Sequence, residues 1–214
     1  MRKLRVERFS LARDGFGAGP AQSLANPIGK GGEGVQAWII PTAPFQRLSG
    51  NEAGTTGTDN DVAARGCEHI GAWILGRNMV GSSRGPWPDD RWKGWWGDHP
   101  PYHTAVLVLS HHARKPVDMA GGTPFHFVTD GIGAAVARAR EAAQGTDVRL
   151  GGGVAAIRHF LQAALIDALH RAIAAILLGP GEHRFHGRDR PALGDRCKAH
   201  GASEHATHSV LGKA

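Results

Sequence analysis

DVRLGGGVAAIRHFL, residues 147–161, is the stretch that decides the fold. An apolar strand over 147–150 meets three glycines, and a helix is expected to start directly after them, at 154, and to run to about 165. The first N–H groups of a helix have no partner inside it, and the helix dipole favours an anion there. Glycines let a phosphate approach the backbone closely. The stretch therefore predicts a phosphate-binding turn made by Gly151, Gly152, Gly153, Val154 and Ala155.

Two familiar phosphate-binding patterns do not match this turn fully. A Walker loop needs Lys and then Ser or Thr after its last glycine, and neither follows Gly153. The dinucleotide fingerprint comes closer, with Ala156 at the position of its third glycine, where alanine is tolerated. An ordinary tight turn between a strand and a helix stays open as the alternative interpretation.

Further strands and helices are expected on both sides of this stretch. Alternating apolar and polar side chains predict a half-buried first strand, and short apolar runs predict the others. Strands that alternate with helices are typical of an α/β domain with a mostly parallel sheet. The expected strands are 4–12, 71–76, 105–109, 125–128, 147–150, and two short ones near 195–200 and 207–211. The expected helices are 33–40, one capped by Asp59 or Asn60 and ending near 69, 132–143 capped by Asp130, and 154–165.

The composition fits one globular domain over residues 1–214. Hydrophobic residues make up 41% and charged residues 21%, which disfavours wholesale disorder. Only two cysteines occur, outside any Cys-x-x-Cys pair, which fits a reducing cytoplasm. The net charge is +6, but no block of five basic residues occurs, so an anionic small ligand is favoured over nucleic acid. No apolar run is long enough to predict a membrane span.

Two other strand ends carry residues suited to phosphate. In AWILGRNMVG, residues 72–81, a strand ends at Gly76 and Arg77 can pair with a phosphate through two hydrogen bonds. In VLVLSHHARKP, residues 106–116, the strand ends in a hydroxyl, two histidines and two cations, which could read the 2′-phosphate of NADP. A solvated arginine and a polar turn are the respective alternatives.

The loop over 81–103 contains four of the six tryptophans, Trp87, Trp92, Trp95 and Trp96. They could form an aromatic wall for a flat heterocycle, or a hydrophobic cap over the sheet or a dimer contact. The 13 histidines show no helical spacing suited to zinc, so no metal site is predicted. A serine hydrolase is disfavoured because no Gly-x-Ser-x-Gly elbow is present.

These segments, in this order, resemble the dihydrofolate reductase-like superfamily, and in particular bacterial dihydrofolate reductase family proteins that share a domain with the riboflavin-biosynthesis reductase. The resemblance rests on VERFSLARDGFGAGP, IGAWILGRNMVG, VLVLSHHARKP, FHFVTDGI, DVRLGGGVAAIRHFL and LIDALHRAIAAILLGPGEHRF, and it covers residues 4–185. It implies a three-layer α/β fold with a mostly parallel central sheet and helices on both faces.

The resemblance also implies roles for single residues. The family's Ser-x-Asp-Gly loop, which covers the nicotinamide, is matched at Asp14-Gly15-Phe16, with Ala12 where serine is expected. Asp14 is then the candidate catalytic residue, although an Asp-Gly turn has an equally good structural reason. The implied substrate residues are Gly15, Phe16 and Trp95. The implied cofactor residues are Ala12, Gly17, Gly76, Arg77, Asn78, Ser110, His111, Gly151, Gly152, Gly153, Val154 and Ala155.

Local propensity and the resemblance disagree over residues 166–178. The alanines favour a helix that continues the preceding one. The resemblance implies a strand, although Ala168 and Ala175 replace the glutamate and proline that are usual there. We follow the resemblance and expect a strand, because Ile173, Ile176 and Leu178 can pack in a sheet.

The implied function is that of an NADPH-dependent reductase of a small, flat, pteridine- or pyrimidine-like heterocycle, with the 13–34 loop as a lid. Reduction of dihydrofolate itself would need an acidic residue on the first helix, for which Glu33 is the candidate. The alternative is a non-catalytic homodimer of the same fold that binds a nucleotide or another ligand. The resemblance implies a homodimer in either case.

Overall fold

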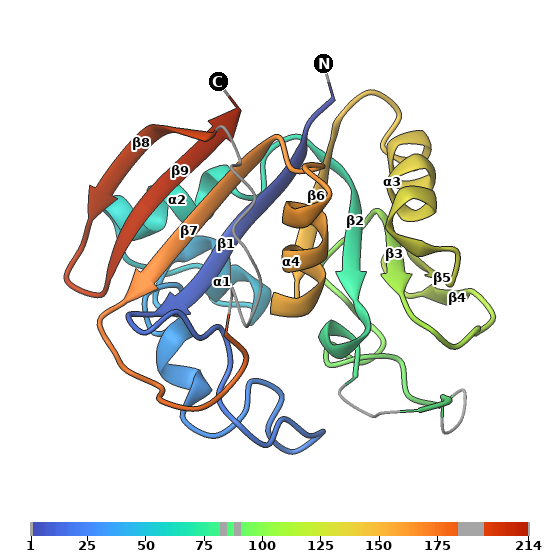
Figure 1. Ribbon diagram of the computed structural model, residues 1–214, viewed down its shortest axis with the longest axis horizontal. Helices are drawn as coiled ribbons and strands as arrows, with labels where there is room; N and C mark the ends of the chain where they lie inside the picture. The colour runs from blue at the N-terminus through green and yellow to red at the C-terminus, as the bar shows by residue number, and fades with distance from the viewer. Residues whose placement is uncertain (1, 82–84, 88–90, 184–194, 214) are drawn as a thin grey trace.

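A central mixed sheet organises the molecule (Figure 1). The computed structural model describes residues 2–81, 85–87, 91–183 and 195–213, and these form a nine-stranded sheet in the order β4-β5-β3-β2-β6-β1-β7-β9-β8. The strands from β5 to β7 in this order are parallel, and β4 and β9 run antiparallel to their neighbours. The strands are β1 Leu4–Ala12, β2 Ile70–Gly76, β3 Ala105–Leu109, β4 Val117–Met119, β5 Thr123–Val128, β6 Asp147–Gly152, β7 Ala168–Ala174, β8 Asp195–Ala202 and β9 Ala206–Lys213.

Helices cover both faces of the sheet, which confirms the predicted three-layer, mostly parallel α/β fold. In Figure 1, α3 and α4 lie in front of the sheet, and α1 and α2 lie behind it. The α-helices are α1 Ala43–Leu48, α2 Thr58–Arg65, α3 Gly131–Ala142 and α4 Val154–Gln162, and two short 3₁₀ helices are η1 Gly32–Gln36 and η2 Arg77–Met79. The assignment of the whole chain to a single domain stays a prediction.

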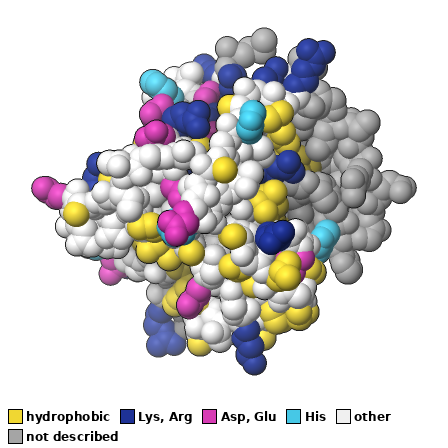
Figure 2. Space-filling model, turned by 90° about the vertical axis from the view of Figure 1, so that its left-hand side faces the viewer, with side chains coloured by type: hydrophobic (Ala, Val, Ile, Leu, Met, Phe, Trp, Pro, Cys, Tyr) yellow, Lys and Arg dark blue, Asp and Glu magenta, His cyan; other side chains and the backbone are white. Residues whose placement is uncertain are grey.

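Opposite charges are mixed on the side of the molecule that carries β8 and β9. Figure 2 shows Lys and Arg side chains scattered there, with Asp and Glu between them and hydrophobic groups nearer the centre. Among the described residues visible in this view, Lys and Arg do not form one basic stripe. In the described part of the chain, every helix is too short or too polar to span a bilayer.

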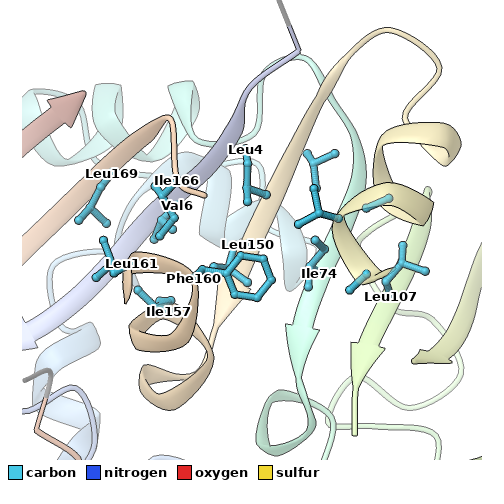
Figure 3. Packing of buried hydrophobic residues seen from close by; sticks show 14 of the residues in the cluster. Leu4, Val6, Ile74, Leu107, Leu150, Ile157, Phe160, Leu161, Ile166 and Leu169 are labelled. Carbon is cyan, nitrogen blue, oxygen red and sulfur yellow. The ribbon is translucent and has the colours of Figure 1, made fainter. Parts of the chain in front are cut away.

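The main core lies between the sheet and the helices α3 and α4. On α4 the residues Val154, Ile157, Phe160 and Leu161 recur at helical spacing and are all buried. They pack against Leu4, Val6, Leu150 and Leu169 of the central strands (Figure 3). Each fully buried aliphatic or aromatic side chain contributes about 1.5–3 kcal/mol. This packing fixes where the first turn of α4 stands against β6.

The opposite face is covered in two parts. Behind β7 and β9, Trp38 is fully buried and packs with Ala172, Ala206 and Ala63. Behind β2, β3 and β5 the cover comes from the tryptophan-containing loop, of which residues 82–84 and 88–90 lie outside the described residues. There Trp92 donates its indole N–H to the Val80 carbonyl at 2.7 Å.

The strand prediction for residues 166–178 is confirmed over β7. Its residues pair with β1 on one side and with β9 on the other, so non-local hydrogen bonds override the helical preference of alanine. The small side chain of Ala172 leaves room for the Trp38 indole. The two predicted tail strands are also confirmed, and β8 and β9 are longer than expected.

Several predicted helix starts need correction, because the side chains expected to cap them bind other partners. Helix α2 begins at Thr58 and ends at Arg65, with Gly57 rather than Asp59 or Asn60 at its N-cap. Asn60 instead accepts the backbone N–H of Ala43, the first residue of α1, at 3.1 Å, and α1 itself is a helix that the sequence did not lead us to expect. Asp130 stands at the N-cap of α3 without a side-chain cap bond, since its carboxylate pairs with Arg138. Strand β4 is not predicted by any sequence pattern noted above.

A bulge interrupts the regular pairing of β1 with its neighbours β6 and β7. Val6 is opposite Leu169, but Phe9 is opposite Arg171, so Glu7 and Arg8 together face His170. Arg8 has φ +59, and it donates its backbone N–H to His170 Nδ1 at 3.1 Å. Since β1 pairs with β6 only as far as Val6, the strands separate beyond this point.

Arg149, a buried arginine of β6, stabilises the bulge through hydrogen bonds. Arg149 donates to the Glu7 carbonyl at 3.2 Å and to the Gly66 carbonyl at 2.6 Å, and its guanidinium lies over the Trp73 ring. Burial, together with the nearby charge of Arg8, lowers the pKa of Arg149 to about 9. The bulge is therefore held by its own backbone hydrogen bonds and by a side chain from the neighbouring strand.

Two buried histidines, His170 and His208, connect the bulge to α2 through a chain of hydrogen bonds. His170 Nε2 lies 3.1 Å from His208 Nδ1, and His208 Nε2 lies 2.6 Å from Asp59 Oδ1. Because the Arg8 N–H can only donate, His170 Nδ1 accepts, so the remaining proton of the neutral ring is on Nε2 and points to His208. Burial, His208 and the charges of Arg65, Arg149 and Arg8 lower the pKa of His170 to about 3.

This pKa predicts a loss of stability in mild acid. A histidine in the unfolded chain has a pKa near 6.5, so between about pH 6.5 and 3 the unfolded state binds a proton that the native state excludes. The free energy of unfolding is expected to fall by up to about 1.4 kcal/mol per pH unit from this residue alone. Urea unfolding at pH 7, 6 and 5 measures it. His170→Gln should have a shallower pH dependence, and an unchanged slope would show that His170 is not responsible.

Candidate active site

A cleft of about 630 Å³ lies where the parallel strands end. It follows the gap that opens when β1 and β6 separate. At one end it is bounded by Thr129, Gly131 and Ile132 after β5, and at the other by Ser10 and Gln36. Crevices at the carboxyl ends of parallel strands, at the point where the strand order reverses, are the usual ligand sites of such sheets.

The glycine turn after β6 forms the middle of the cleft. The strand continues through Gly151 and Gly152, two residues further than predicted, and α4 starts at Val154. Gly152 has φ +115, a conformation that favours glycine. A Cβ on Gly76 would lie 3.2 Å from both Gly152 O and Gly153 N, so glycine lets the ends of β2 and β6 meet closely. Gly151, Gly152, Gly153, Val154 and Ala155 all line the cleft, as do Gly76 and Asn78.

The first turn of α4 offers hydrogen-bond donors to the cleft. Its first helical hydrogen bond runs from the Ile157 N–H to the Gly153 carbonyl, so the N–H groups of Val154, Ala155 and Ala156 precede the helical pattern. Its N-cap residue, Gly153, has no side chain that could cap the helix. The backbone N–H donors of this turn and the positive end of the α4 dipole therefore lie in the same wall of the cleft.

Arg77 lines the cleft and is oriented by the loop that follows it. Its guanidinium donates to the carbonyls of Gly85 and Pro86 and lies 4.2 Å from the centre of the Trp87 ring. Arg114 lies over the same ring, at 5.0 Å. Partial burial lowers the pKa of Arg77 from its ordinary value. Stacking on an indole restricts a guanidinium to a plane suited to an oxyanion.

The end of β3 brings a hydroxyl and two histidines to the cleft. Ser110, His111 and His112 line it. Ser110 Oγ donates to the His112 carbonyl at 2.9 Å and accepts the His112 N–H at 3.0 Å, which closes the turn locally. His111 is exposed beside this turn. The Ser110 hydroxyl thus already has two partners within its own turn.

The predicted catalytic loop lies beside the cleft, and only its end reaches the lining. Gly17 lines the cleft, whereas Ala12, Asp14, Gly15 and Phe16 lie outside the lining. Asp14 Oδ2 accepts the N–H groups of Leu178 and Gly179 at 3.0 and 2.8 Å. Asp14 Oδ1 is buried and has no hydrogen-bond partner among the described residues.

The same loop is joined to the segment after β7. Gly17 N–H donates to the Glu182 carbonyl at 3.0 Å, and Glu182 N–H donates to the Ala18 carbonyl at 3.0 Å. The Phe16 ring meets the edge of the His183 ring at 4.9 Å between centres. These contacts fix the start of the predicted lid against a segment far away in sequence.

Trp95 also lies outside the cleft lining. Its indole N–H is 3.3 Å from the Asn78 carbonyl, and its ring meets Trp92 edge to face at 5.2 Å. Trp92 lies against Gly81 and Val80, on the face of β2 and β3. These contacts favour the hydrophobic cap among the interpretations of the tryptophan loop.

Several lining residues were not predicted from the sequence. The bulged part of β1, from Glu7 to Ser10, lines the cleft, and so does Gln36 of η1. The local sequence does not predict the bulge, because the alternation of apolar and polar residues over 4–12 is typical of a regular strand. Glu33, the predicted acidic candidate, is exposed and outside the lining. Among the described residues, no three His, Cys, Asp or Glu side chains are grouped so as to hold a metal ion.

Comparisons with known proteins agree with this architecture. The family model described as the RibD C-terminal domain matches residues 31–206. A structure of a candidate riboflavin biosynthesis protein from Shewanella sp. PV-4 superimposes with a TM-score of 0.62 at 16% identity, covering 99% of both chains. None of the curated proteins compared with the chain matches its sequence.

Two longer proteins also share the fold. One is a diaminohydroxyphosphoribosylaminopyrimidine deaminase/5-amino-6-(5-phosphoribosylamino)uracil reductase from Thermotoga maritima, with a TM-score of 0.53 at 12% identity. The other is RibD of Acinetobacter baumannii, with a TM-score of 0.55 at 14% identity. All of this chain is covered in both cases, but it spans only 57% and 58% of those proteins. At such identities the likeness shows the fold alone.

Proposed function

The chain belongs to the RibD C-terminal domain family, and from that premise we propose that it is an NADPH-dependent reductase of a small flat heterocycle. The observation that carries the proposal is the cleft at the strand ends, with a glycine turn and an uncapped helix start in its wall. Backbone donors of this kind bind the pyrophosphate of a dinucleotide. The names of two structural relatives, RibD and a uracil reductase, support the choice of substrate class.

The lining fits such a cofactor along its length. Pyrophosphate would lie on the turn from Gly151 to Ala155, where a Cβ on Gly153 would meet nothing within 4 Å and so leaves space. Arg77 would add a planar cation beside Gly76 and Asn78. Ser110 and His111 would stand nearest the 2′-phosphate, at the end of the cleft bounded by Thr129 and Ile132.

When bound, the cofactor supplies the hydride, and the chain positions the reacting partners. The remaining part of the cleft, from Gly17 to Ser10, would hold the heterocycle. Ala18, Pro27 and Ile28 there would exclude water from the ring. For Asp14 we propose a positioning role, since its carboxylate holds the segment after β7 and lies outside the lining. The homodimer implied by the family resemblance stays a prediction.

Titration with NADPH and, separately, with NADH tests the proposal. Quenching of tryptophan fluorescence and energy transfer to the nicotinamide report binding. Saturable binding is expected, about tenfold tighter for NADPH because of its extra phosphate. Binding of neither nucleotide at millimolar concentration would contradict the proposal. A subsequent screen for heterocycle-dependent loss of NADPH absorbance separates a reductase from the non-catalytic alternative.

A further inference from the structure

Three tryptophans of the loop over 81–103 are joined to the backbone that follows β2 and β3. Each donates its indole N–H to a carbonyl there: Trp87 to His112 at 3.0 Å, Trp92 to Val80 at 2.7 Å and Trp95 to Asn78 at 3.3 Å. The two strands are parallel neighbours and end on the same side of the sheet (Figure 1). Only the partner of Trp87 among these three follows β3, so Trp87 connects the loop that leaves β2 to the end of the next strand.

The ring of Trp87 is the surface on which Arg77 lies. Arg77 directly follows β2, and its guanidinium carbon is 4.2 Å from the centre of the Trp87 ring. The same guanidinium donates to the carbonyls of Gly85 and Pro86, the two residues before Trp87. From β5, the Phe127 ring meets the Trp87 ring edge to face at 5.1 Å between centres. The direction of the Arg77 guanidinium is therefore set by a ring that a third strand holds in place.

The indole N–H of Trp87 holds the turn at the end of β3. The His112 carbonyl that accepts this N–H also accepts the Ser110 hydroxyl at 2.9 Å, and Ser110 Oγ accepts the His112 N–H at 3.0 Å. Both Ser110 and His112 line the cleft. Without the indole N–H, the turn would keep only the hydrogen bonds that it forms within itself, and its position against β2 would be less restricted.

We propose that Trp87 is a positioning residue for two phosphate subsites of the cleft: its ring orients Arg77 for the pyrophosphate, and its indole N–H keeps the Ser110–His112 turn in place for the 2′-phosphate. This inference rests on the proposed function, because it explains how the chain keeps the two subsites at a fixed separation. Trp87 itself lies outside the cleft lining and acts through these partners. Groups held in position before the ligand arrives bind it more tightly, because less freedom is lost on binding.

Trp87→Phe separates the two parts of this role. Phenylalanine keeps an aromatic ring for Arg77 but has no N–H for the His112 carbonyl. NADH has no 2′-phosphate, so its affinity should stay within about twofold of wild type, since the cation still lies on an aromatic ring. NADPH should bind about five- to tenfold more weakly, because the turn that meets its extra phosphate has lost a hydrogen bond. Isothermal titration calorimetry measures both affinities without using tryptophan fluorescence, which the substitution itself changes.

Trp96→Phe is the matched control. Trp96 belongs to the same loop, is 42% exposed and lies outside the cleft lining. Both nucleotides should bind this variant within about twofold of wild type, because the same chemical change is made away from the two subsites. If Trp96→Phe lowers the preference for NADPH as much as Trp87→Phe does, the effect belongs to the loop in general and the proposal is overturned. Thermal midpoints of both variants show that the fold is kept.

A double-mutant cycle tests whether Trp87 acts through Arg77. Trp87→Leu removes the ring as well as the N–H, so it should weaken NADH binding about fivefold, which Trp87→Phe does not. Combined with Arg77→Ala, it should weaken NADH binding no more than about twofold beyond Arg77→Ala alone, because the ring then has no phosphate-binding cation to orient. Losses that multiply in full would mean that the Trp87 ring acts on something other than Arg77, and this would overturn that half of the proposal.

The wild-type titrations separate this inference from the proposed function. If the wild-type protein prefers NADPH and Trp87→Phe keeps the same preference, the role of Trp87 is wrong and the proposed function stands. If the wild-type protein binds neither nucleotide, the proposed function fails, and the inference about Trp87 fails with it.

Discussion

Gly153→Asp is expected to weaken NADPH binding at least about 100-fold while the protein stays folded. Gly153 has φ −74 and ψ −166, a conformation open to any residue, and a Cβ there would meet nothing within 4 Å. The added carboxylate would project into the space proposed for the pyrophosphate, beside the uncapped first turn of α4. It would repel the phosphates and could itself accept the free N–H groups. A 100-fold loss corresponds to about 2.7 kcal/mol.

The control for added charge is Ala137→Asp. Ala137 lies exposed in the middle of α3, further along the helix from the cleft end at Ile132, and it does not line the cleft. Its NADPH affinity should stay within about threefold of wild type, because the charge is added away from the turn. The thermal midpoints of both variants show that the fold is kept. Equal NADPH affinities for the two variants would exclude the glycine turn as the phosphate site.

Arg77→Ala is expected to weaken NADPH binding about 10- to 100-fold. A charge-assisted hydrogen bond to phosphate contributes about 1.5–3 kcal/mol, and Arg77 can form two of them from its stacked position on Trp87. Arg77→Lys should recover only part of the affinity, since an ammonium group has no plane to stack on the indole. Fluorescence titration at two salt concentrations measures both the affinity and its salt dependence.

The salt dependence distinguishes a lost phosphate contact from a disturbed loop. Arg77→Ala removes one cation from the cleft, so its affinity should fall less steeply with salt than that of the wild type. Arg47→Ala, in the last turn of α1 and outside the lining, removes the same charge elsewhere and should bind as the wild type does. Weaker binding with an unchanged salt slope would mean that Arg77 acts only by holding the loop at Gly85 and Pro86.

The part of the cleft nearest the glycine turn was predictable from the sequence, because its residues are contiguous. Gly151 to Ala155 combine a strand end, a turn and a helix start within one stretch, and local geometry dictates where their backbone N–H groups point. Gly76 and Ser110 could be added because each directly follows an apolar strand, and parallel strands end at one edge of a sheet.

The other end of the cleft could not be predicted, because its shape depends on contacts between distant residues. The β1 bulge exists because Glu7 and Arg8 are fastened by Arg149 and His170, which lie more than 140 positions further along the chain. The same holds for Asp14, because the local Asp-Gly pattern does not predict that its carboxylate accepts the N–H groups of Leu178 and Gly179. Likewise, the Gln36 side chain is placed at the cleft by its hydrogen bond with Ser10, which in turn accepts the Trp38 indole N–H.

The sequence by itself thus determined the α/β class, the run of most strands and the glycine turn, since hydrophobic period and turn chemistry are local properties. Tertiary structure decided that 168–174 is a strand, that Asp59 and Asn60 serve other elements than their own helix, and that the cleft extends to Gln36. The physical reason is the same each time. Hydrogen-bond partners and buried surface supplied by distant residues outweigh local preferences that differ by less than about 1 kcal/mol per residue.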